Sequence, residues 1–154
     1  MKTYGHFDDA RREYVITDPA TPFPWINYLG NEDFFGLISN TAGGYDFYKD
    51  AKFRRITRYR YNNVVPMDNG GRYFYINDNG TVWNPGWKPC KTPLDEYECR
   101  HGMNYTRITG KKNGIEASVL FFVPLHTWAE VQKLTLTNTT RESRTLKLFS
   151  LAEW

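Results

Sequence analysis

Glycine and proline, the residues that most often interrupt regular structure, are unevenly distributed in this 154-residue chain. All 12 glycines lie at or before Gly114, and all 8 prolines lie at or before Pro124. The first part of the chain therefore favours short strands with many turns, and the last part favours long extended segments. Apolar and polar side chains alternate in residues 115–123, 129–138 and 145–154. This alternation predicts three consecutive antiparallel strands.

The first of these three segments is the most apolar. Its odd-numbered positions are expected to face a core, and Leu120 and Phe122 make its other face apolar too. We therefore expect this strand to be covered on both faces. Across the three segments, the side chains expected to face inward are Ile115, Ala117, Val119, Phe121, Val123, Leu134, Leu136, Leu146 and Leu148.

The rest of the chain also favours β-structure. Aromatic residues number 26 (10 Phe, 11 Tyr, 5 Trp), against 24 Leu, Ile and Val residues. This balance favours strands with wide, half-buried surfaces over a helical bundle. Asn79-Gly80 lies between two strand-like segments and predicts a tight hairpin. Further strands are expected at residues 13–17, 25–29, 34–39, 45–48, 72–77, 81–83, 97–100 and 104–109. The predicted fold class is all-β, as a sandwich of two antiparallel sheets.

Charge and cysteine content exclude several classes of protein. With 20 basic and 17 acidic residues, the formal net charge of +3 is too small to indicate a nucleic-acid partner. The basic, aromatic run at residues 54–61 suits a sugar surface equally well. Cys90 and Cys99 are too few for a disulfide scaffold. The chain shows neither a signal peptide nor a transmembrane segment, so we expect a cytoplasmic protein with reduced thiols and no membrane partner.

The sequence contains no evident catalytic constellation. Three adjacent acidic pairs place neighbouring carboxylates on opposite faces of a strand, so these pairs are expected to be solvated. The histidines have no metal-ligand spacing, and we expect no metal site. Cys99 and His101 share one face of a strand, but no orienting group or oxyanion hole accompanies them. Structural use is therefore favoured, with a ligand-facing or interface-facing loop as the alternative. The acidic pairs are Asp8-Asp9, Glu32-Asp33 and Asp95-Glu96, and the histidines are His6, His101 and His126.

Two loops and one aromatic pair are candidates for binding. The Gly-Gly loop before Tyr45 lacks phosphate-loop spacing, and its glycines suit a turn with positive φ. Trp83 and Trp87 flank a Pro-Gly turn, where such a pair either stacks on a sugar or covers a core edge. Ionisable groups at residues 99–101 are hard to place in a β-core. We expect the following residues to face a substrate or a partner domain, with no catalytic residue among them: Gly43, Gly44, Tyr45, Arg100, His101, Trp83 and Trp87.

A series of collinear motifs covers essentially the whole chain. They lie at residues 7–9, 13–17, 24–30, 38–45, 54–63, 71–73, 85–87, 97–102 and 121–125, and include Phe7-Asp8-Asp9, Gly71-Arg72-Tyr73 and Pro85-Gly86-Trp87. In this order they resemble the N-terminal domain of the cellobiose phosphorylases in glycoside hydrolase family 94. One departure is Val64-Val65, where a single valine is expected, and it predicts a bulge or a longer loop.

The resemblance implies a galactose-mutarotase-like supersandwich. In the family, this domain precedes a helical linker, an (α/α)6 barrel and a small C-terminal β-domain, and the enzymes are homodimers. They cleave a β-1,4-linked disaccharide with inorganic phosphate and invert the anomeric carbon, so one general-acid aspartate suffices, without a cofactor. In the family, that aspartate and the phosphate-binding residues lie in the barrel, which corresponds to positions beyond residue 154. The motifs favour cellobiose over chitobiose as the substrate.

Two classes of function remain. In the first, the chain is the leading part of a phosphorylase and supplies scaffold, dimer contacts and one wall of the sugar site. In the second, it is an autonomous carbohydrate-binding module that uses Trp83, Trp87 and Tyr45. Residues 151–154 lie inside an alternating strand, so we expect a domain that is incomplete at its C-terminus and has an open sheet edge there. The alternative is a final strand that is fully paired.

Overall fold

The structure, a computed structural model, describes residues 2–59 and 70–154. Within these residues the chain forms twelve β-strands and no helix, so none of them builds a helix able to span a membrane. The all-β prediction is confirmed. The strands are β1 (Gly5–Asp8), β2 (Glu13–Ile16), β3 (Ile26–Gly30), β4 (Phe34–Ser39), β5 (Gly44–Tyr48), β6 (Arg72–Asp78), β7 (Thr81–Trp83), β8 (Glu96–Gly102), β9 (Tyr105–Lys112), β10 (Ile115–Phe122), β11 (Val131–Asn138) and β12 (Leu146–Ala152). Val64-Val65 lies outside the described residues.

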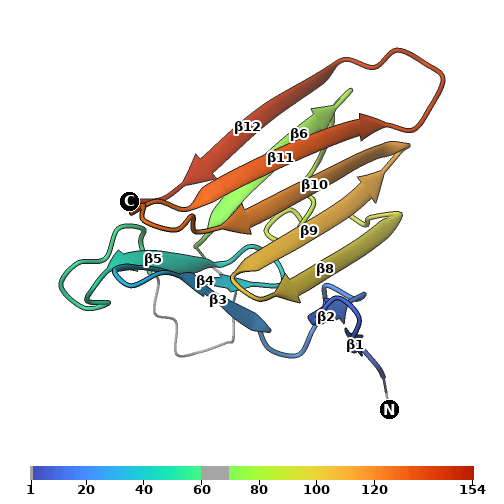
Figure 1. Ribbon diagram of the computed structural model, residues 1–154. Helices are drawn as coiled ribbons and strands as arrows, with labels where there is room; N and C mark the ends of the chain where they lie inside the picture. Colours follow the sequence, from blue (N-terminus) through green and yellow to red (C-terminus); the bar gives the residue numbers. More distant parts are fainter. Residues whose placement is uncertain (1, 60–69) are drawn as a thin grey trace.

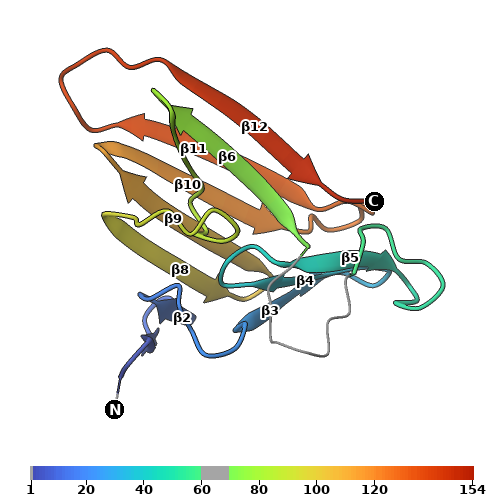
Figure 2. The ribbon, with the colours of Figure 1, turned by 180° about the vertical axis from the view of Figure 1, so that it is seen from behind.

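The strands form three antiparallel sheets rather than the two expected. The large sheet has the order β1-β2-β8-β9-β10-β11, the second sheet β12-β6-β7, and the third sheet β3-β4-β5. Figures 1 and 2 show the second sheet facing the large sheet as a separate layer, with the third sheet across one end. The large sheet and the second sheet make the expected sandwich. The third sheet is separate because its three strands follow one another through short turns and pair among themselves.

Local sequence signals explain two further details of the strands. Asn79 and Gly80 have φ values of 49° and 92° and join β6 to β7, so the predicted tight hairpin is confirmed. β1 was not predicted, because only one of its four residues has a large apolar side chain and no alternating pattern is visible. That side chain, Phe7, is 75% exposed, and the strand is held by pairing with β2.

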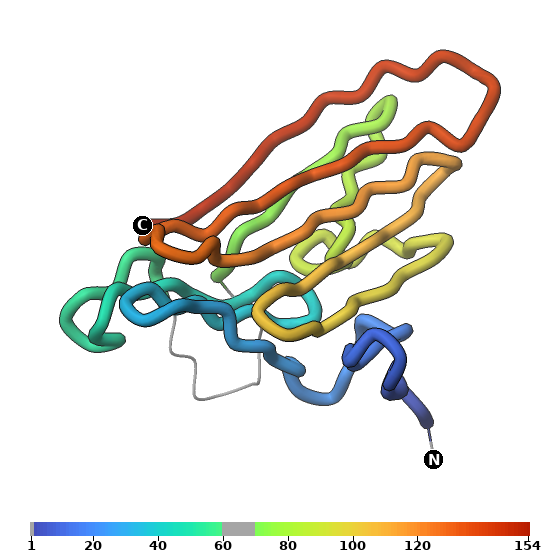
Figure 3. Tube along the Cα trace, viewed as in Figure 1, coloured from blue at the N-terminus to red at the C-terminus, as the bar shows by residue number. Residues whose placement is uncertain are grey.

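The segment at residues 145–154 is a strand, but the prediction that it pairs with its predecessor is wrong. β12 pairs with β6, from Leu146 opposite Asp78 to Ala152 opposite Arg72. The connection at residues 139–145 is too long for a tight hairpin, and Figure 3 shows it crossing from β11 to the other layer. Arg144 ends this connection with a salt bridge to Asp78, at the end of β6. This ion pair lies next to the first paired position of β12 and β6.

The core lies between the large sheet and the other two. The five predicted inward side chains of residues 115–123 are each at most 2% exposed, which confirms the predicted alternation. They belong to two apolar clusters, one of which contains Ile16, Ile38 and Cys99, and the other Ile76 and Trp83. The even-numbered side chains of β10 are only half-buried, so this strand is fully packed on one face rather than on both.

β11 and β12 are edge strands of different sheets. Leu134 and Leu146 are half-buried and pack against the core, as predicted. Leu136 and Leu148, which were also expected inside, are 38% and 47% exposed because the described chain places no strand over them. Among the described strands, β12 pairs only with β6 and its second edge has no partner; Trp154 beyond it is 80% exposed.

We predict that Gly44→Ala destabilises the domain more than Gly80→Ala. Gly44 has a φ of +127°, and an added Cβ would lie 1.8 Å from the carbonyl oxygen of Leu37. Gly80 has a φ of +92° with no neighbour within 4 Å, so its change isolates the backbone cost of about 1–2 kcal/mol. Urea unfolding is expected to show a loss at Gly44 at least twice as large. Equal losses would contradict the close packing of this turn.

We also predict that this chain alone self-associates at roughly tens of micromolar, because open strand edges with apolar side chains pair readily. Phe149 and Leu151 on β12 are 56% and 45% exposed. Phe149→Lys with Leu151→Lys is expected to restore a monomer in sedimentation velocity. Thr135→Lys, at an exposed position of β11, is the matched control and leaves association unchanged. A wild-type monomer at these concentrations would contradict the prediction.

Candidate functional site

The predicted site residues lie in three parts of the fold. Gly43, Gly44 and Tyr45 lie at the turn from β4 into β5, Arg100 and His101 lie in β8, and Trp83 and Trp87 lie at the end of β7 and in the loop after it. Arg100 and Trp87 line one groove on the large sheet, and the other five do not line it. The structure therefore does not gather the seven residues into one site.

The Gly-Gly turn is fixed by its backbone contacts. Gly43 forms an isolated β-bridge with Gly71, and its N–H donates to Ser39 Oγ at 3.0 Å. The Gly44 N–H donates to the Gly70 carbonyl oxygen at 3.1 Å. The turn is thus closed by backbone from the start of β6, and the expected positive φ is confirmed at Gly44.

Tyr45 belongs to a row of aromatic rings on the outer face of the third sheet. Its ring centroid lies 4.8 Å from that of Tyr59 and 5.9 Å from that of Phe47, which stacks on Phe35 at 5.3 Å. The Arg55 guanidinium lies 5.9 Å from the centroids of both tyrosine rings. Because the rings pack on one another, Tyr45 does not present a free, flat stacking surface.

A buried ion cluster, which the sequence did not predict, lies where the three sheets meet. Arg72 on β6 donates from Nη2 to Asp46 Oδ1 on β5 at 2.6 Å and from Nε to Glu130 Oε1, just before β11, at 2.8 Å. A further contact joins Arg72 Nη2 to Glu130 Oε2. The side chains of Arg72, Asp46 and Glu130 are 1%, 5% and 4% exposed. We call these three residues the sheet junction.

Neutral groups complete the hydrogen bonding of the sheet junction. Thr57 Oγ1 donates to Asp46 Oδ2 at 3.1 Å, and Gln132 Nε2 donates to Glu130 Oε1 at 3.1 Å. Arg72 Nη1 donates to the Leu37 carbonyl oxygen at 2.9 Å. A Cβ at Gly36 would lie 2.7 Å from Asp46 Oδ1, so only a glycine leaves room for the cluster there.

Burial and charge act in opposite directions on the sheet junction. Burial would lower the pKa of Arg72, but the adjacent Glu130 and Asp46 carboxylates outweigh it and raise that pKa, so the guanidinium stays charged. Burial raises the pKa of Glu130 to about 7, assisted by the nearby Asp46 and opposed by Arg72. Two carboxylates thus compete for one buried cation.

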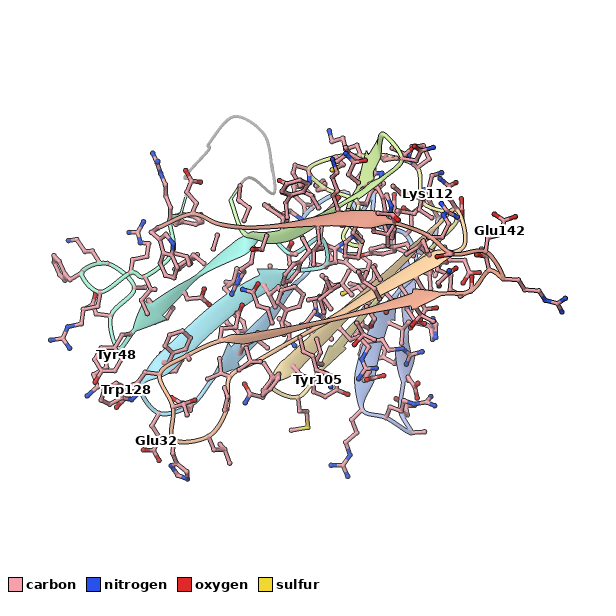
Figure 4. The ribbon with its side chains drawn as sticks, turned by 90° about the horizontal axis from the view of Figure 1, so that it is seen from above. Glu32, Tyr48, Tyr105, Lys112, Trp128 and Glu142 are labelled. Carbon is pink, nitrogen blue, oxygen red and sulfur yellow. The ribbon has the colours of Figure 1, made fainter. Side chains whose placement is uncertain are left out.

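The connection from β10 to β11 carries Glu130 to the third sheet. Trp128 in this connection packs its ring edge-on against Tyr48 of β5, with centroids 5.2 Å apart, and Figure 4 shows the two side by side at one end of the domain. Asn31 Nδ2 donates to the carbonyl oxygens of Pro124 and Thr127 at 3.1 and 2.6 Å. These contacts hold the connection in place before it reaches the sheet junction.

Arg100 lies at the centre of a second, more exposed ion cluster. It binds both carboxylate oxygens of Glu98, at 2.6 and 3.0 Å, and Glu13 Oε2 at 2.7 Å. Tyr105 Oη donates to the other Glu13 oxygen at 2.5 Å. Hydrogen bonds to Glu98 and Glu13 raise the pKa of Arg100. Burial opposes the ionised form of Glu13, but the bonds from Tyr105 and Arg100 prevail and lower its pKa.

This second cluster lies in a polar groove of 1040 Å³ on the outer face of the large sheet. Cross-strand rows of side chains line the groove: Lys111 pairs with Glu96 at 2.8 Å and with Glu116 at 3.3 Å. Thr109 and Ser118 hydroxyls are hydrogen-bonded at 3.0 Å in the next row. A charged, internally paired face of this kind is typical of a sheet that faces water or a polar partner surface.

His101 and Cys99 do not form a nucleophilic pair. In the neutral tautomer that fits both contacts, His101 Nε2 donates to the Trp25 carbonyl oxygen at 3.0 Å, and Nδ1 accepts from Thr106 Oγ1 at 2.9 Å. Burial lowers the pKa of His101 and raises that of the Cys99 thiol, which is fully buried. A neutral imidazole beside a protonated, inaccessible thiol is not a nucleophilic pair.

The expectation that Trp83 faces a ligand is corrected by the structure. Trp83 is 0% exposed and belongs to the core, because its position on β7 faces inward beside Ile76. The sequence left two roles open for this aromatic pair, stacking on a sugar or covering the core, and Trp83 has the second. Trp87 is half-buried, with a φ of 69°, at the rim of the polar groove.

One signal for the sheet junction was present in the sequence. Arg72 occupies an inward position of an alternating strand, in phase with Ile76, and a buried arginine requires acidic partners. Nothing local identifies Asp46 and Glu130 as those partners, since they lie 26 and 58 residues away from Arg72. In the described part of the chain, no group of three His, Cys, Asp or Glu side chains is arranged to hold a metal ion.

We predict that Arg72→Ala lowers the free energy of unfolding by about 3–5 kcal/mol at neutral pH, because it leaves two buried carboxylates without their cation. The matched control is Arg58→Ala, which removes an ion pair with Glu153 whose side chains are 56% and 29% exposed. That change is expected to cost less than about 1 kcal/mol. Urea unfolding measures both, and comparable losses would show that the sheet junction contributes no more than a surface pair.

Comparison with known proteins connects this fold to one family. Residues 12–154 match the family described as glycosyl hydrolase 94, supersandwich domain. The chain is 42% identical to an N,N'-diacetylchitobiose phosphorylase of Vibrio proteolyticus, over 98% of this chain and 19% of that protein. It is 35% identical to a solabiose phosphorylase of Paenibacillus borealis, over 100% of this chain and 20% of that protein. It is also 38% identical to a 3-O-beta-D-glucopyranosyl-beta-D-glucuronide phosphorylase of the same organism, over 96% of this chain and 18% of that protein. The chain thus spans about a fifth of the length of these relatives, and it belongs to the glycosyl hydrolase 94 supersandwich-domain family.

Proposed function

We propose that this chain is the N-terminal supersandwich part of an inverting disaccharide phosphorylase. The observation that carries the proposal is the match over residues 12–154, together with relatives that are phosphorylases of about five times this length. The domain supplies a scaffold, dimer contacts and a wall of the sugar site. We also propose that the whole enzyme is a cytoplasmic homodimer. It uses inorganic phosphate as a co-substrate and needs no cofactor.

In the proposed reaction, a phosphate oxygen attacks the anomeric carbon while the glycosidic bond breaks. A carboxylic acid gives its proton to the leaving sugar oxygen, and the product is a sugar 1-phosphate of inverted configuration. The most buried carboxylates among the described residues are unsuited to that role, because each binds an arginine: Asp46 and Glu130 bind Arg72, Asp78 binds Arg144, and Glu13 binds Arg100. In line with what the family resemblance implies, we assign the catalytic acid to the part of the enzyme beyond this domain.

The substrate is proposed to be a β-linked disaccharide. Cellobiose is the first candidate, from the resemblance of the motifs. N,N'-Diacetylchitobiose is the second, because the chain is 42% identical to a phosphorylase named for that sugar. The turn at Gly43, Gly44 and Tyr45 is proposed to face the substrate or a partner domain, as are the groove residues Arg100 and Trp87.

An autonomous carbohydrate-binding module is not favoured by this structure. That function required an exposed platform formed by Trp83, Trp87 and Tyr45. Trp83 is in the core, and Tyr45 packs against neighbouring rings. Trp87 alone remains at a groove, which is too little for a stacking platform.

The test compares the protein encoded by the complete reading frame with this 154-residue chain. Each is incubated with phosphate and, in turn, cellobiose, N,N'-diacetylchitobiose and maltose as the α-linked control, and the released sugar 1-phosphate is measured. The longer protein is expected to turn over one β-linked sugar and not maltose, and the short chain none. Turnover by the short chain within tenfold of an ordinary enzyme rate of about 10 s⁻¹ would overturn the assignment of the catalytic acid.

A further inference from the structure

The sheet junction carries an unbalanced charge. Asp46 and Glu130 would contribute two negative charges when ionised, against the single positive charge of Arg72, and all three side chains are at most 5% exposed. Among residues 2–59 and 70–154, the other groups that bond to the cluster through their side chains or carbonyl oxygens are neutral: the Thr57 hydroxyl, the Gln132 amide and the Leu37 carbonyl. Arg72 and Asp46 are the ionisable groups with the largest effects on Glu130. Within the part of the chain that the structure describes, a net charge of −1 would therefore be buried without a compensating partner.

A buried, uncompensated charge costs several kcal/mol, and carboxyl groups avoid that cost by binding a proton. Two carboxyl groups that share one site behave as a coupled pair, in which the first ionises readily and the second resists ionisation. The bidentate contact from Arg72 favours ionised Glu130, while burial and the neighbouring Asp46 oppose it. One cation suffices to balance one of the two carboxylates.

We propose that the sheet junction is a proton-binding site: the Asp46–Glu130 pair holds one proton beside Arg72 near neutral pH, and loss of that proton weakens the contact between the three sheets. The three residues come from three different sheets or their connections, so a repulsion within the cluster acts directly on how the sheets pack. The proposal does not depend on any phosphorylase activity.

The proton site is connected to the Gly-Gly turn. Arg72 Nη1 donates to the Leu37 carbonyl oxygen, the same oxygen against which Gly44 packs too closely to admit a Cβ. A shift of the guanidinium toward or away from Glu130 therefore changes the support of this turn. The backbone amide of Gly44 is a natural reporter of the protonation state.

The sign of the pH dependence follows from linkage. A carboxyl group whose pKa is higher in the folded chain than in the unfolded chain binds its proton more tightly when folded, so unfolding releases a proton. For Glu130 this window runs from the ordinary value of 4.5 up to about 7. Stability from this group is fully present below the window and is lost as the pH rises through it.

The first experiment is a carbon-13 NMR titration of the side-chain carboxyl groups between pH 4 and 9, with the Glu130 signal assigned by its loss in Glu130→Gln. The Glu130 signal is expected to titrate near neutral pH, and the Gly44 amide shift is expected to follow the same midpoint. Asp46→Asn removes the repulsion and is expected to lower the Glu130 midpoint. Titration of Glu130 below pH 5, or a Gly44 amide that does not follow it, would overturn the proposal.

The second experiment compares urea unfolding of the wild type and Glu130→Gln from pH 5 to 8. The unfolding constant of the wild type is expected to rise relative to that of the variant by up to about tenfold per pH unit inside the window, because one proton is released. Glu116→Gln is the matched control, since it removes a carboxylate that is 34% exposed and paired with Lys111. A pH-independent ratio for Glu130→Gln, or an equal change in the control, would overturn the proposal. If Glu130→Gln fails to fold, the Gly44 amide of the wild type remains the readout: a midpoint near neutral pH supports the proposal, and its absence overturns it.

Discussion

The ion cluster of Arg72, Asp46 and Glu130 is the interaction on which the arrangement of the three sheets depends. Each sheet forms through local backbone pairing, but only contacts between sheets fix how they lie against one another. Apolar packing supplies most of the favourable free energy there and is non-directional. A guanidinium that must satisfy two buried carboxylates imposes direction, because its donors have a fixed fork geometry. The cluster thus fixes the orientation of sheets that hydrophobic burial holds together.

The two faces of the large sheet carry different interactions. The inner face consists of the apolar residues of β8, β9 and β10, and the outer face carries cross-strand ion pairs such as Lys111 with Glu96 and Glu116. The same alternation that buries one set of side chains places the other in the polar groove. The polar groove therefore follows from the alternation of side chains along the strands. Two of the predicted site residues line it: Arg100 from β8 and Trp87 from the loop after β7.

For a domain proposed to be part of a larger enzyme, the exposed surfaces are informative. β12 is open along one edge, and the third sheet shows a row of packed aromatic rings capped by Arg55. The strongly held carboxylates are structural ones, since each is bound to an arginine. These carboxylates stabilise the fold, and the exposed surfaces are available for contacts with other parts of an enzyme. Both observations agree with the proposal that the catalytic acid lies outside this domain.

The sequence by itself determined the all-β class, the inward positions of β10, the Asn79-Gly80 hairpin and, through its motifs, the family. These features depend on neighbours within a few residues, or on the order of motifs along the chain. Only the tertiary structure decided that β12 pairs with β6, that Trp83 is in the core, and that Asp46 and Glu130 meet at Arg72. Strand pairing and burial of an individual side chain depend on distant partners, which alternation cannot specify. An ion pair likewise depends on the distance between two side chains in the folded structure, which their separation along the chain does not determine.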